Sequence, residues 1–148
     1  MIKGLSNYFL MNVLNKLVTF NGVFSIDNIP NSVLLKKHYV FICNLSRANE
    51  KGSHFITIVK KNNTITIHDS LAINHYPNLK LGNEKLIYKY HNPIQEITSS
   101  FCGFYCIYFV LTNLAPNKRS ALIPFLKTQL HKNDEICIVN IENIIKNM

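Results

Sequence analysis

Residues 54–69 read His-Phe-Ile-Thr-Ile-Val-Lys-Lys-Asn-Asn-Thr-Ile-Thr-Ile-His-Asp, a pattern of two strand-like runs around a polar turn. Its two halves, 54–59 and 64–69, are rich in the β-branched and aromatic residues that favour strands. Asparagine tolerates a positive φ, so the Lys-Lys-Asn-Asn segment between them predicts the turn of a β-hairpin. We therefore expect an antiparallel pair of strands near the middle of the chain.

The loop length of this hairpin decides whether His54 and Asp69 meet. If Lys61 pairs with Thr64, then Ile56 faces Asp69, and His54 becomes a diagonal neighbour of Asp69 on the same face of the sheet. Diagonal neighbours lie about 7–8 Å apart, a gap that an imidazole and a carboxylate can close with a hydrogen bond. A three-residue loop would put the two on opposite faces, as an unrelated strand-end histidine and turn aspartate.

The remaining elements predict an α+β fold. The segment Cys102–Leu114 is apolar nearly all round, as is typical of a helix buried in the middle of a domain. Further helical patterns cover 5–20, with Ser6 as its N-cap, 118–130, interrupted by Pro124, and 134–146; strand patterns cover 39–43 and 85–90. We expect a single domain over residues 1–148, with the 102–114 helix packed against a mostly antiparallel sheet.

The chain is basic and carries four cysteines in apolar surroundings. Sixteen Lys and Arg against eight Asp and Glu give a net charge of +8, which predicts attraction to nucleic acid or, alternatively, a lysine-rich surface that serves solubility. Cys43, Cys102, Cys106 and Cys137 form no C-x₂-C pair, which disfavours a zinc site and indicates free thiols in a reducing compartment. Neither a signal-peptide pattern nor an apolar run of membrane-spanning length is present, so a soluble, intracellular protein is expected.

Cys102 stands where a helix begins, and there the positive end of the helix dipole and unpaired N–H groups favour a thiolate. Ser99 or Ser100 is expected to cap this helix, and Gly103 allows close approach of another backbone or a substrate. The alternative is that Cys102 is a small buried hydrophobic residue, which is our interpretation of Cys106 one turn later.

His54, Asp69, Gln95 and Cys102 together supply a base, a group that orients it, an oxyanion donor and a nucleophile. The other histidines are expected at the surface or behind the site, with His68 pointing to the face opposite Asp69; they are His38, His68, His75, His91 and His131.

These residues, in this order, resemble the adenovirus-type cysteine proteases, the adenain-like peptidases that also occur in large DNA viruses and virus-like transposons. The most specific block is 99–109, Ser-Ser-Phe-Cys-Gly-Phe-Tyr-Cys-Ile-Tyr-Phe, with Gln95 before it. Weaker blocks are Gly22–Ser25, Ile29-Pro30, Gly52–Phe55, Asp69-Ser70 and Asn133-Asp134. The family often has Trp at the position of Phe55 and an aromatic residue at the position of His68, and neither difference removes a catalytic atom.

The resemblance implies a thiol endopeptidase with a fold related to papain and to the ubiquitin-like-protein proteases. His54 is then the general base, Asp69 its orienting acid, Cys102 the nucleophile and Gln95 an oxyanion donor. Such enzymes cleave capsid and core precursors during virion maturation, often after glycine, inside the host cell or the virion. The resemblance also implies stimulation by non-specifically bound DNA, and it leaves any activating peptide unknown.

Two other functions remain open from the sequence. A protease for SUMO or another ubiquitin-like protein shares the catalytic order and an Asp-Ser pair, but such enzymes usually clamp a diglycine tail under tryptophan, and this chain has no Trp. A basic, capsid-associated nucleic-acid-binding protein on a protease fold would be favoured by a missing catalytic residue, and none is missing.

Overall fold

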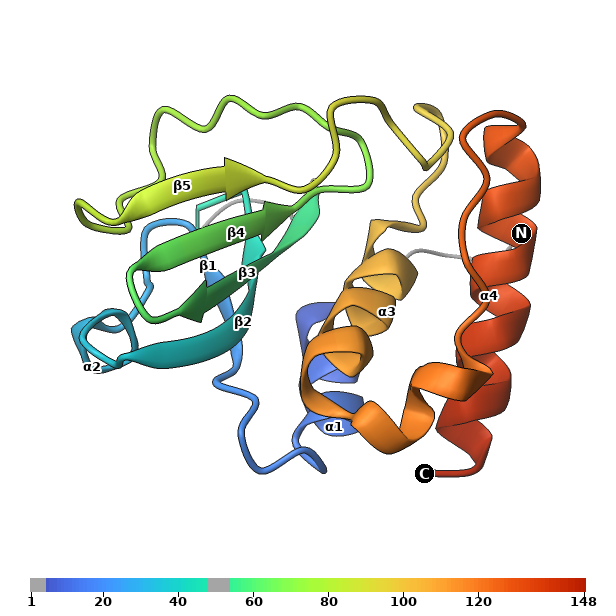
Figure 1. Cartoon of the computed structure of the whole chain (residues 1–148), viewed down its shortest axis with the longest axis horizontal. Coiled ribbons are helices and arrows are strands. Elements are labelled where there is room, and N and C mark those ends of the chain that lie inside the picture. The colour runs from blue at the N-terminus through green and yellow to red at the C-terminus, as the bar shows by residue number, and fades with distance from the viewer. Residues whose placement is uncertain (1–4, 48–53) are drawn as a thin grey trace.

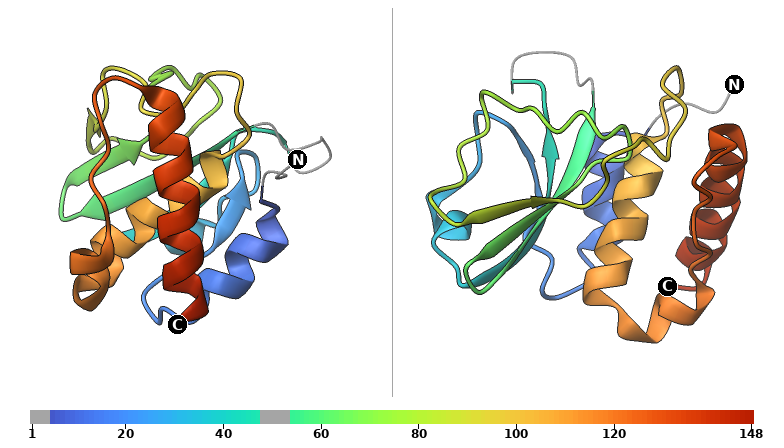
Figure 2. Two further views of the ribbon diagram at one scale, coloured as in Figure 1. Left: turned by 90° about the vertical axis from the view of Figure 1, so that its right-hand side faces the viewer. Right: turned by 45° about the horizontal axis from the view of Figure 1, so that its top comes forward.

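The computed structural model describes residues 5–47 and 54–148, which form a five-stranded sheet covered by helices (Figure 1). The strands are β1 (Val23–Ser25), β2 (His38–Asn44), β3 (Phe55–Lys61), β4 (Thr64–His68) and β5 (Lys85–Tyr88). The helices are α1 (Asn7–Leu14), α2 (Asn31–Leu34), α3 (Cys102–Leu114), the 3₁₀ helix η1 (Pro116–Ala121) and α4 (Leu130–Lys146). The strands follow the chain order across the sheet, and α3 lies between the sheet and α4 (Figures 1 and 2).

The β3–β4 hairpin has the predicted register. Lys61 pairs with Thr64 and Thr57 with His68, so the ladder extended by one residue sets Ile56 opposite Asp69. Asn62 in the turn has a φ of 56°, a left-handed conformation that asparagine adopts more readily than most residues. The turn residue thus fixes the register that brings the ends of both strands together.

The α+β prediction is confirmed, and the expectation of a mostly antiparallel sheet holds for the central strands of what is a mixed sheet. The β2–β3 and β3–β4 pairs are antiparallel, whereas β1 runs parallel to β2 and β5 parallel to β4. The chain reaches β2 from β1 through residues 26–37, which include α2, and reaches β5 from β4 through residues 69–84. Connections of this length carry the chain back across the sheet, which allows the next strand to run in the same direction.

Two hydrophobic cores lie on opposite faces of the sheet because side chains alternate along β3. Phe55 and Val59 face α3 and the other helices, while Ile56 and Ile58 face the opposite side. Partly buried residues from β1, α2 and the 69–84 segment cover that second side, among them Phe24, Leu34, Tyr76 and Leu79. α3 is buried on nearly all sides, as predicted.

Helix ends differ from the predictions in three places, one of which is α4, which begins at Leu130 instead of residue 134. α1 begins after the predicted Ser6 cap, whose hydroxyl accepts a hydrogen bond from Phe9 N at 3.2 Å, but it ends at Leu14 instead of residue 20. The following residues form tight turns that bring Phe20 into the core. Between 118 and 130 only η1 is helical, because Pro124 cannot donate the backbone hydrogen bond that a continuous helix needs.

Candidate active site

The site is built where the ends of β3 and β4 meet the start of α3. His54 precedes β3 directly and Asp69 follows β4 directly, and the predicted contact between them is present. Nε2 of His54 lies 2.6 Å from Oδ1 of Asp69, and both side chains are buried. A charge-assisted hydrogen bond of this length, shielded from water, fixes the orientation of the imidazole ring.

Asp69 is held by three further donors besides His54. The backbone N–H of Leu71 donates to Oδ1 at 2.9 Å, that of Ile73 donates to Oδ2 at 3.1 Å, and the Tyr76 hydroxyl also donates to Oδ2. Burial alone would raise the pKa of Asp69, but the His54 contact and these donors outweigh it and lower the pKa. Asp69 is therefore a fixed carboxylate.

Cys102 is the first residue of α3 and is 7% exposed. Burial alone would lower the pKa of His54, but its hydrogen bonds to Asp69 and Cys102 outweigh burial and raise the pKa to about 9. The imidazole that Asp69 holds thus also interacts with the Cys102 thiol. The helix dipole adds positive potential at the sulfur.

The predicted caps of α3 are not formed. Its N-cap position is Phe101, with no side-chain hydrogen bond, and Ser99 contacts Gln95 instead. Gly103 does serve close approach, because a Cβ atom there would lie 3.0 Å from Cβ of Leu5. The segment that leads into α1 therefore packs closely against Gly103.

Gln95 is a buried residue with both ends of its amide fixed. Its Oε1 accepts a hydrogen bond from the Ser70 hydroxyl at 2.5 Å, and its Nε2 lies 3.1 Å from the carbonyl oxygen and 3.0 Å from the hydroxyl of Ser99. The donating end of Gln95 is therefore directed toward the residues just before Cys102. Gln95 is therefore a fixed, buried residue of its loop and not a solvated one.

The loop that carries Gln95 is clamped from three sides. Backbone N–H groups of Ile94 and Gln95 donate to the carbonyl oxygen of Ser70 at 2.9 and 3.1 Å. The Ile94 carbonyl accepts from Nδ2 of Asn133 at 2.9 Å and lies 3.3 Å from the Tyr105 hydroxyl, which contacts Asp134 at 2.6 Å. The β4 end, α3 and α4 all position this loop.

Sequence reasoning gave no role to Ser70, Tyr76 or Asn133, although all three support the site. Ser70 and Asn133 belong to the motif blocks of the family resemblance, but the resemblance assigned no role to either residue. Tyr76 lies in the 69–84 connection, where no periodic pattern points to a partner. The residues Gly52 and Ser53 of another block lie outside the described residues.

The other cysteines have the properties of core residues. Cys43, Cys106 and Cys137 are free and almost completely buried. Burial raises the pKa of Cys43 to about 12 and the pKa values of Cys106 and Cys137 well above the ordinary value. These thiols are unsuited to nucleophilic chemistry.

The histidines outside the site lie in the two kinds of position that were expected, at the surface or behind the site. His38, His75, His91 and His131 are exposed, as expected. His68 does point to the face opposite Asp69, but it is buried, with its ring centroid 5.1 Å from that of Phe109. Of the two expected positions, at the surface or behind the site, His68 has the buried one, since α3 covers that face of β4.

Within residues 5–47 and 54–148, no cluster of three or more His, Cys, Asp and Glu side chains could hold a metal ion. No helix in this part of the chain has the length and hydrophobicity needed to cross a membrane. No protein-family model matches the chain, and no curated protein matches it in sequence.

Proposed function

We propose that the chain is a cysteine endopeptidase of the adenovirus type, with the fold of that family. The observation that carries the proposal is the buried 2.6 Å contact between His54 and Asp69, together with the interaction of that imidazole with Cys102 at the start of α3. A nucleophile, a base within reach of it and a group that orients the base are the parts that thiol catalysis requires. Gln95, which the structure describes as fixed and buried, adds the oxyanion donor.

The proposed reaction starts from an ion pair in which His54 holds the proton given up by Cys102, since its raised pKa of about 9 keeps the imidazole protonated at neutral pH. Since Nε2 of His54 is bonded to Asp69, Nδ1 is the ring nitrogen that receives the proton. The sulfur then attacks the carbonyl carbon of the scissile peptide, and the carbonyl oxygen becomes an oxyanion. The imidazolium returns its proton to the leaving amine as the C–N bond breaks, which leaves a thioester on Cys102.

Water completes the cycle. His54 takes a proton from the attacking water, hydroxide adds to the thioester carbonyl, and the proton goes to the departing sulfur of Cys102. Asp69 holds the ring in place and stabilises the imidazolium in both halves of the reaction, as a carboxylate with its pKa lowered can do.

The oxyanion is held by the backbone N–H of Cys102 and by Nε2 of Gln95. In the resting enzyme this nitrogen faces the hydroxyl and the carbonyl oxygen of Ser99, so the oxyanion replaces one of these acceptors. The Ser70 hydroxyl keeps Oε1 turned away and thereby aims the donating end of the amide. Such preorganised donors supply a large share of transition-state stabilisation.

The substrate class follows from the family resemblance and from burial. We propose capsid or core precursors that are cleaved after small residues such as glycine. The low exposure of Cys102 supports this choice, because a small residue beside the scissile bond lets the peptide backbone approach a recessed sulfur. The absence of tryptophan argues against the alternative of a protease for ubiquitin-like proteins.

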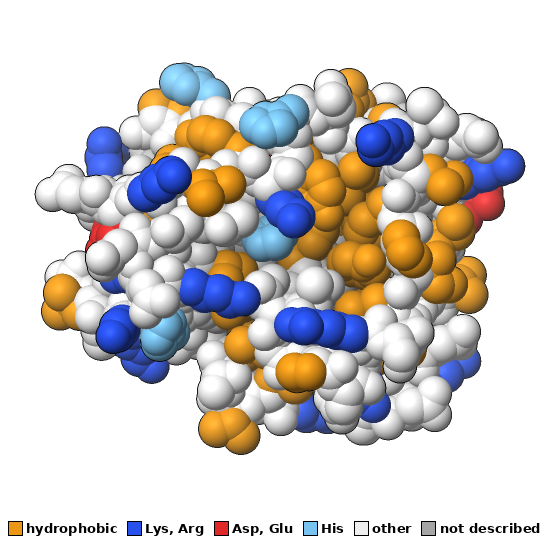
Figure 3. Space-filling view, viewed as in Figure 1, with side chains coloured by type: hydrophobic (Ala, Val, Ile, Leu, Met, Phe, Trp, Pro, Cys, Tyr) orange, Lys and Arg blue, Asp and Glu red, His pale blue; other side chains and the backbone are white. Residues whose placement is uncertain are grey.

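Non-specific DNA is the proposed macromolecular partner. Blue Lys and Arg side chains are spread over the face in Figure 3, with few acidic side chains among them. This distribution accords with the net charge of +8 and with attraction to phosphate. A non-enzymatic, nucleic-acid-binding role would share this surface but would not require the Cys102–His54–Asp69 arrangement.

The test is cleavage of glycine-containing peptides and of a basic, DNA-bound protein substrate by the purified chain, with and without DNA. We expect cleavage by the wild type and none by Cys102→Ala. If DNA accelerates cleavage of the protein substrate alone, enzyme and substrate are co-localised on DNA. If DNA also accelerates cleavage of an uncharged peptide, DNA shifts the conformational ensemble of the active site. Equal hydrolysis by wild type and Cys102→Ala would refute the proposal.

A further inference from the structure

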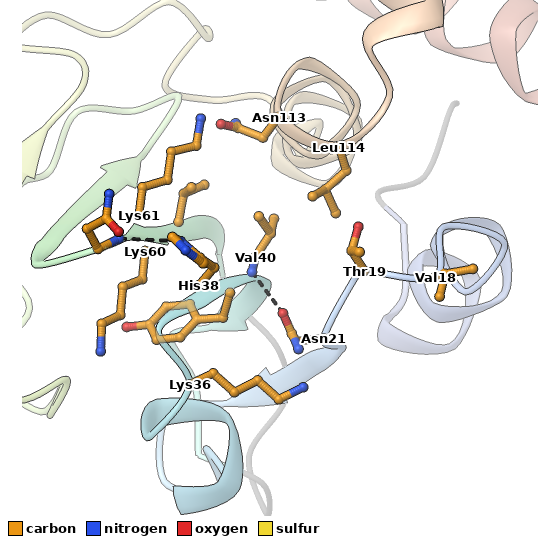
Figure 4. Close-up of a pocket in the computed structure, with 13 residues that line it drawn as sticks. Val18, Thr19, Asn21, Lys36, His38, Val40, Lys60, Lys61, Asn113 and Leu114 are labelled. Carbon is orange, nitrogen blue, oxygen red and sulfur yellow. Dashed lines mark hydrogen bonds between the residues drawn. The ribbon is translucent and has the colours of Figure 1, made fainter.

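A pocket of about 570 Å³ lies at the end of the molecule opposite the candidate active site. It is bordered by the end of β3, the start of β2, the end of α3 and the segment after α1, as Figure 4 shows. Leu114, at its rim, is twelve residues after Cys102 on α3, or about 18 Å along the helix axis. The pocket is therefore distinct from the catalytic groups.

The lining of the pocket combines cations with an apolar wall. Its basic residues are Lys36, His38, Lys60 and Lys61, and none of its 13 lining residues is acidic. Its apolar residues are Val18, Tyr39, Val40, Val59 and Leu114. Ligand sites of this size are typically apolar with a few converging polar groups.

Two of the lysines are available to a ligand. Lys60 donates to Glu84 at 2.9 Å, and Figure 4 shows its side chain turned away from Val40 and Leu114. Lys61 extends toward Asn113, and Lys36 toward Asn21, on either side of the apolar wall (Figure 4). Among the described residues, neither Lys36 nor Lys61 forms a salt bridge.

Neutral donors supplement these cations. Nδ1 of His38 accepts from Asn62 N at 3.4 Å, which leaves the Nε2–H group as a donor. Oδ1 of Asn21 accepts from Val40 N at 2.9 Å, which leaves its amide NH₂ group to donate. The pocket thus offers donors for oxygen atoms and no carboxylate to repel an anion.

We propose that this pocket binds a small ligand that joins a flat apolar ring to phosphate, as a nucleotide does. The phosphates would contact Lys36 and Lys61, and the ring would pack on Val40 and Leu114. A free nucleotide is favoured over a nucleic-acid strand because the cations surround a hollow with an apolar wall, whereas backbone-tracking proteins present an extended basic groove with stacking aromatic residues.

The test is isothermal titration of the wild-type chain with ATP, adenosine and inorganic triphosphate in metal-free buffer. We expect one ATP per chain, bound more tightly than either fragment, because both parts of the pocket contribute. Lys36→Ala and Lys61→Ala should each weaken ATP binding about tenfold, the effect of losing one charged hydrogen bond. Lys132→Ala, at an exposed lysine of α4, should leave it unchanged.

A second pair of variants tests the location without disturbing the core. Val18 is 98% exposed and Val139, on α4, is 59% exposed, so an aspartate is tolerated at either position. Val18→Asp should weaken ATP binding, and Val139→Asp should not. Absence of saturable ATP binding, equal effects of the pocket and α4 variants, or binding of duplex DNA alone would overturn the proposal. None of these readouts depends on peptide cleavage.

Discussion

Replacing His68 with phenylalanine should make the fold less sensitive to acid. His68 is buried in β4, stacks on Phe109, and has no hydrogen-bond partner for Nδ1 within the described part of the chain. Burial, with the nearby charges of Lys89 and Lys61, lowers the pKa of His68 to about 4. The imidazole is therefore neutral in the folded protein down to that pH.

The size of the effect follows from this shift. The ordinary pKa is 6.5, so between pH 6.5 and pH 4 the unfolded chain binds a proton at His68 that the folded chain does not. The stability that depends on a neutral His68 is therefore fully present above pH 6.5, and it is lost as the pH falls toward 4. A difference of 2.5 pH units corresponds to about 3 kcal/mol.

Urea unfolding followed by circular dichroism at pH 7 and pH 4.5 measures this loss. Between these pH values the wild type should lose about 2 to 3 kcal/mol more than His68→Phe. As a control, His91→Phe, at an exposed histidine, should behave as the wild type. All three proteins retain Asp69, whose lowered pKa means that its contribution to the free energy of unfolding is lost only at still lower pH. An identical loss in wild type and His68→Phe would refute the reasoning.

Three further predictions concern catalysis and binding. Cys102→Ala and His54→Ala should each abolish peptide cleavage with the fold intact, whereas Cys106→Ala should retain it; activity in either of the first two would contradict the assignment. Gln95→Ala should lower kcat by about 10²–10³-fold. Ser70→Ala should lower kcat by about tenfold, because the Gln95 amide is no longer held in its orientation. An unchanged kcat in either variant would show that the replaced residue has only a structural role. Duplex DNA should bind without sequence preference and with an affinity that falls steeply with salt in filter or anisotropy assays; no binding near physiological salt would leave the charge as a solubility feature.

The hairpin could be predicted from sequence because local rules determine it. The Asn62 turn sets the register, and period-2 alternation then places His54 beside Asp69 without any knowledge of the remaining fold. The buried α3 was equally clear, since an apolar run of 13 residues that ends before Pro116 leaves few alternatives.

The sheet edges and the supports of the site depend on tertiary contacts. β1 has only three residues and α2 only four, so neither carries a periodic signal, and the parallel pairing of β1 and β5 depends on where their connections cross the sheet. Ser70 and Tyr76 acquire roles only when the chain brings Gln95 and Asp69 to them. The burial of His68 likewise depends on the packing of α3 over β4.

The alkylation rate of each cysteine shows whether His54 activates Cys102. The folded chain is treated with iodoacetamide at neutral pH, and labelling at Cys43, Cys102, Cys106 and Cys137 is followed over time by peptide mass spectrometry. We predict that Cys102 reacts first, and that its rate falls about tenfold or more in His54→Ala and stays unchanged in His91→Ala. Faster labelling of any other cysteine, or a Cys102 rate that is the same in wild type and His54→Ala, would contradict this activation.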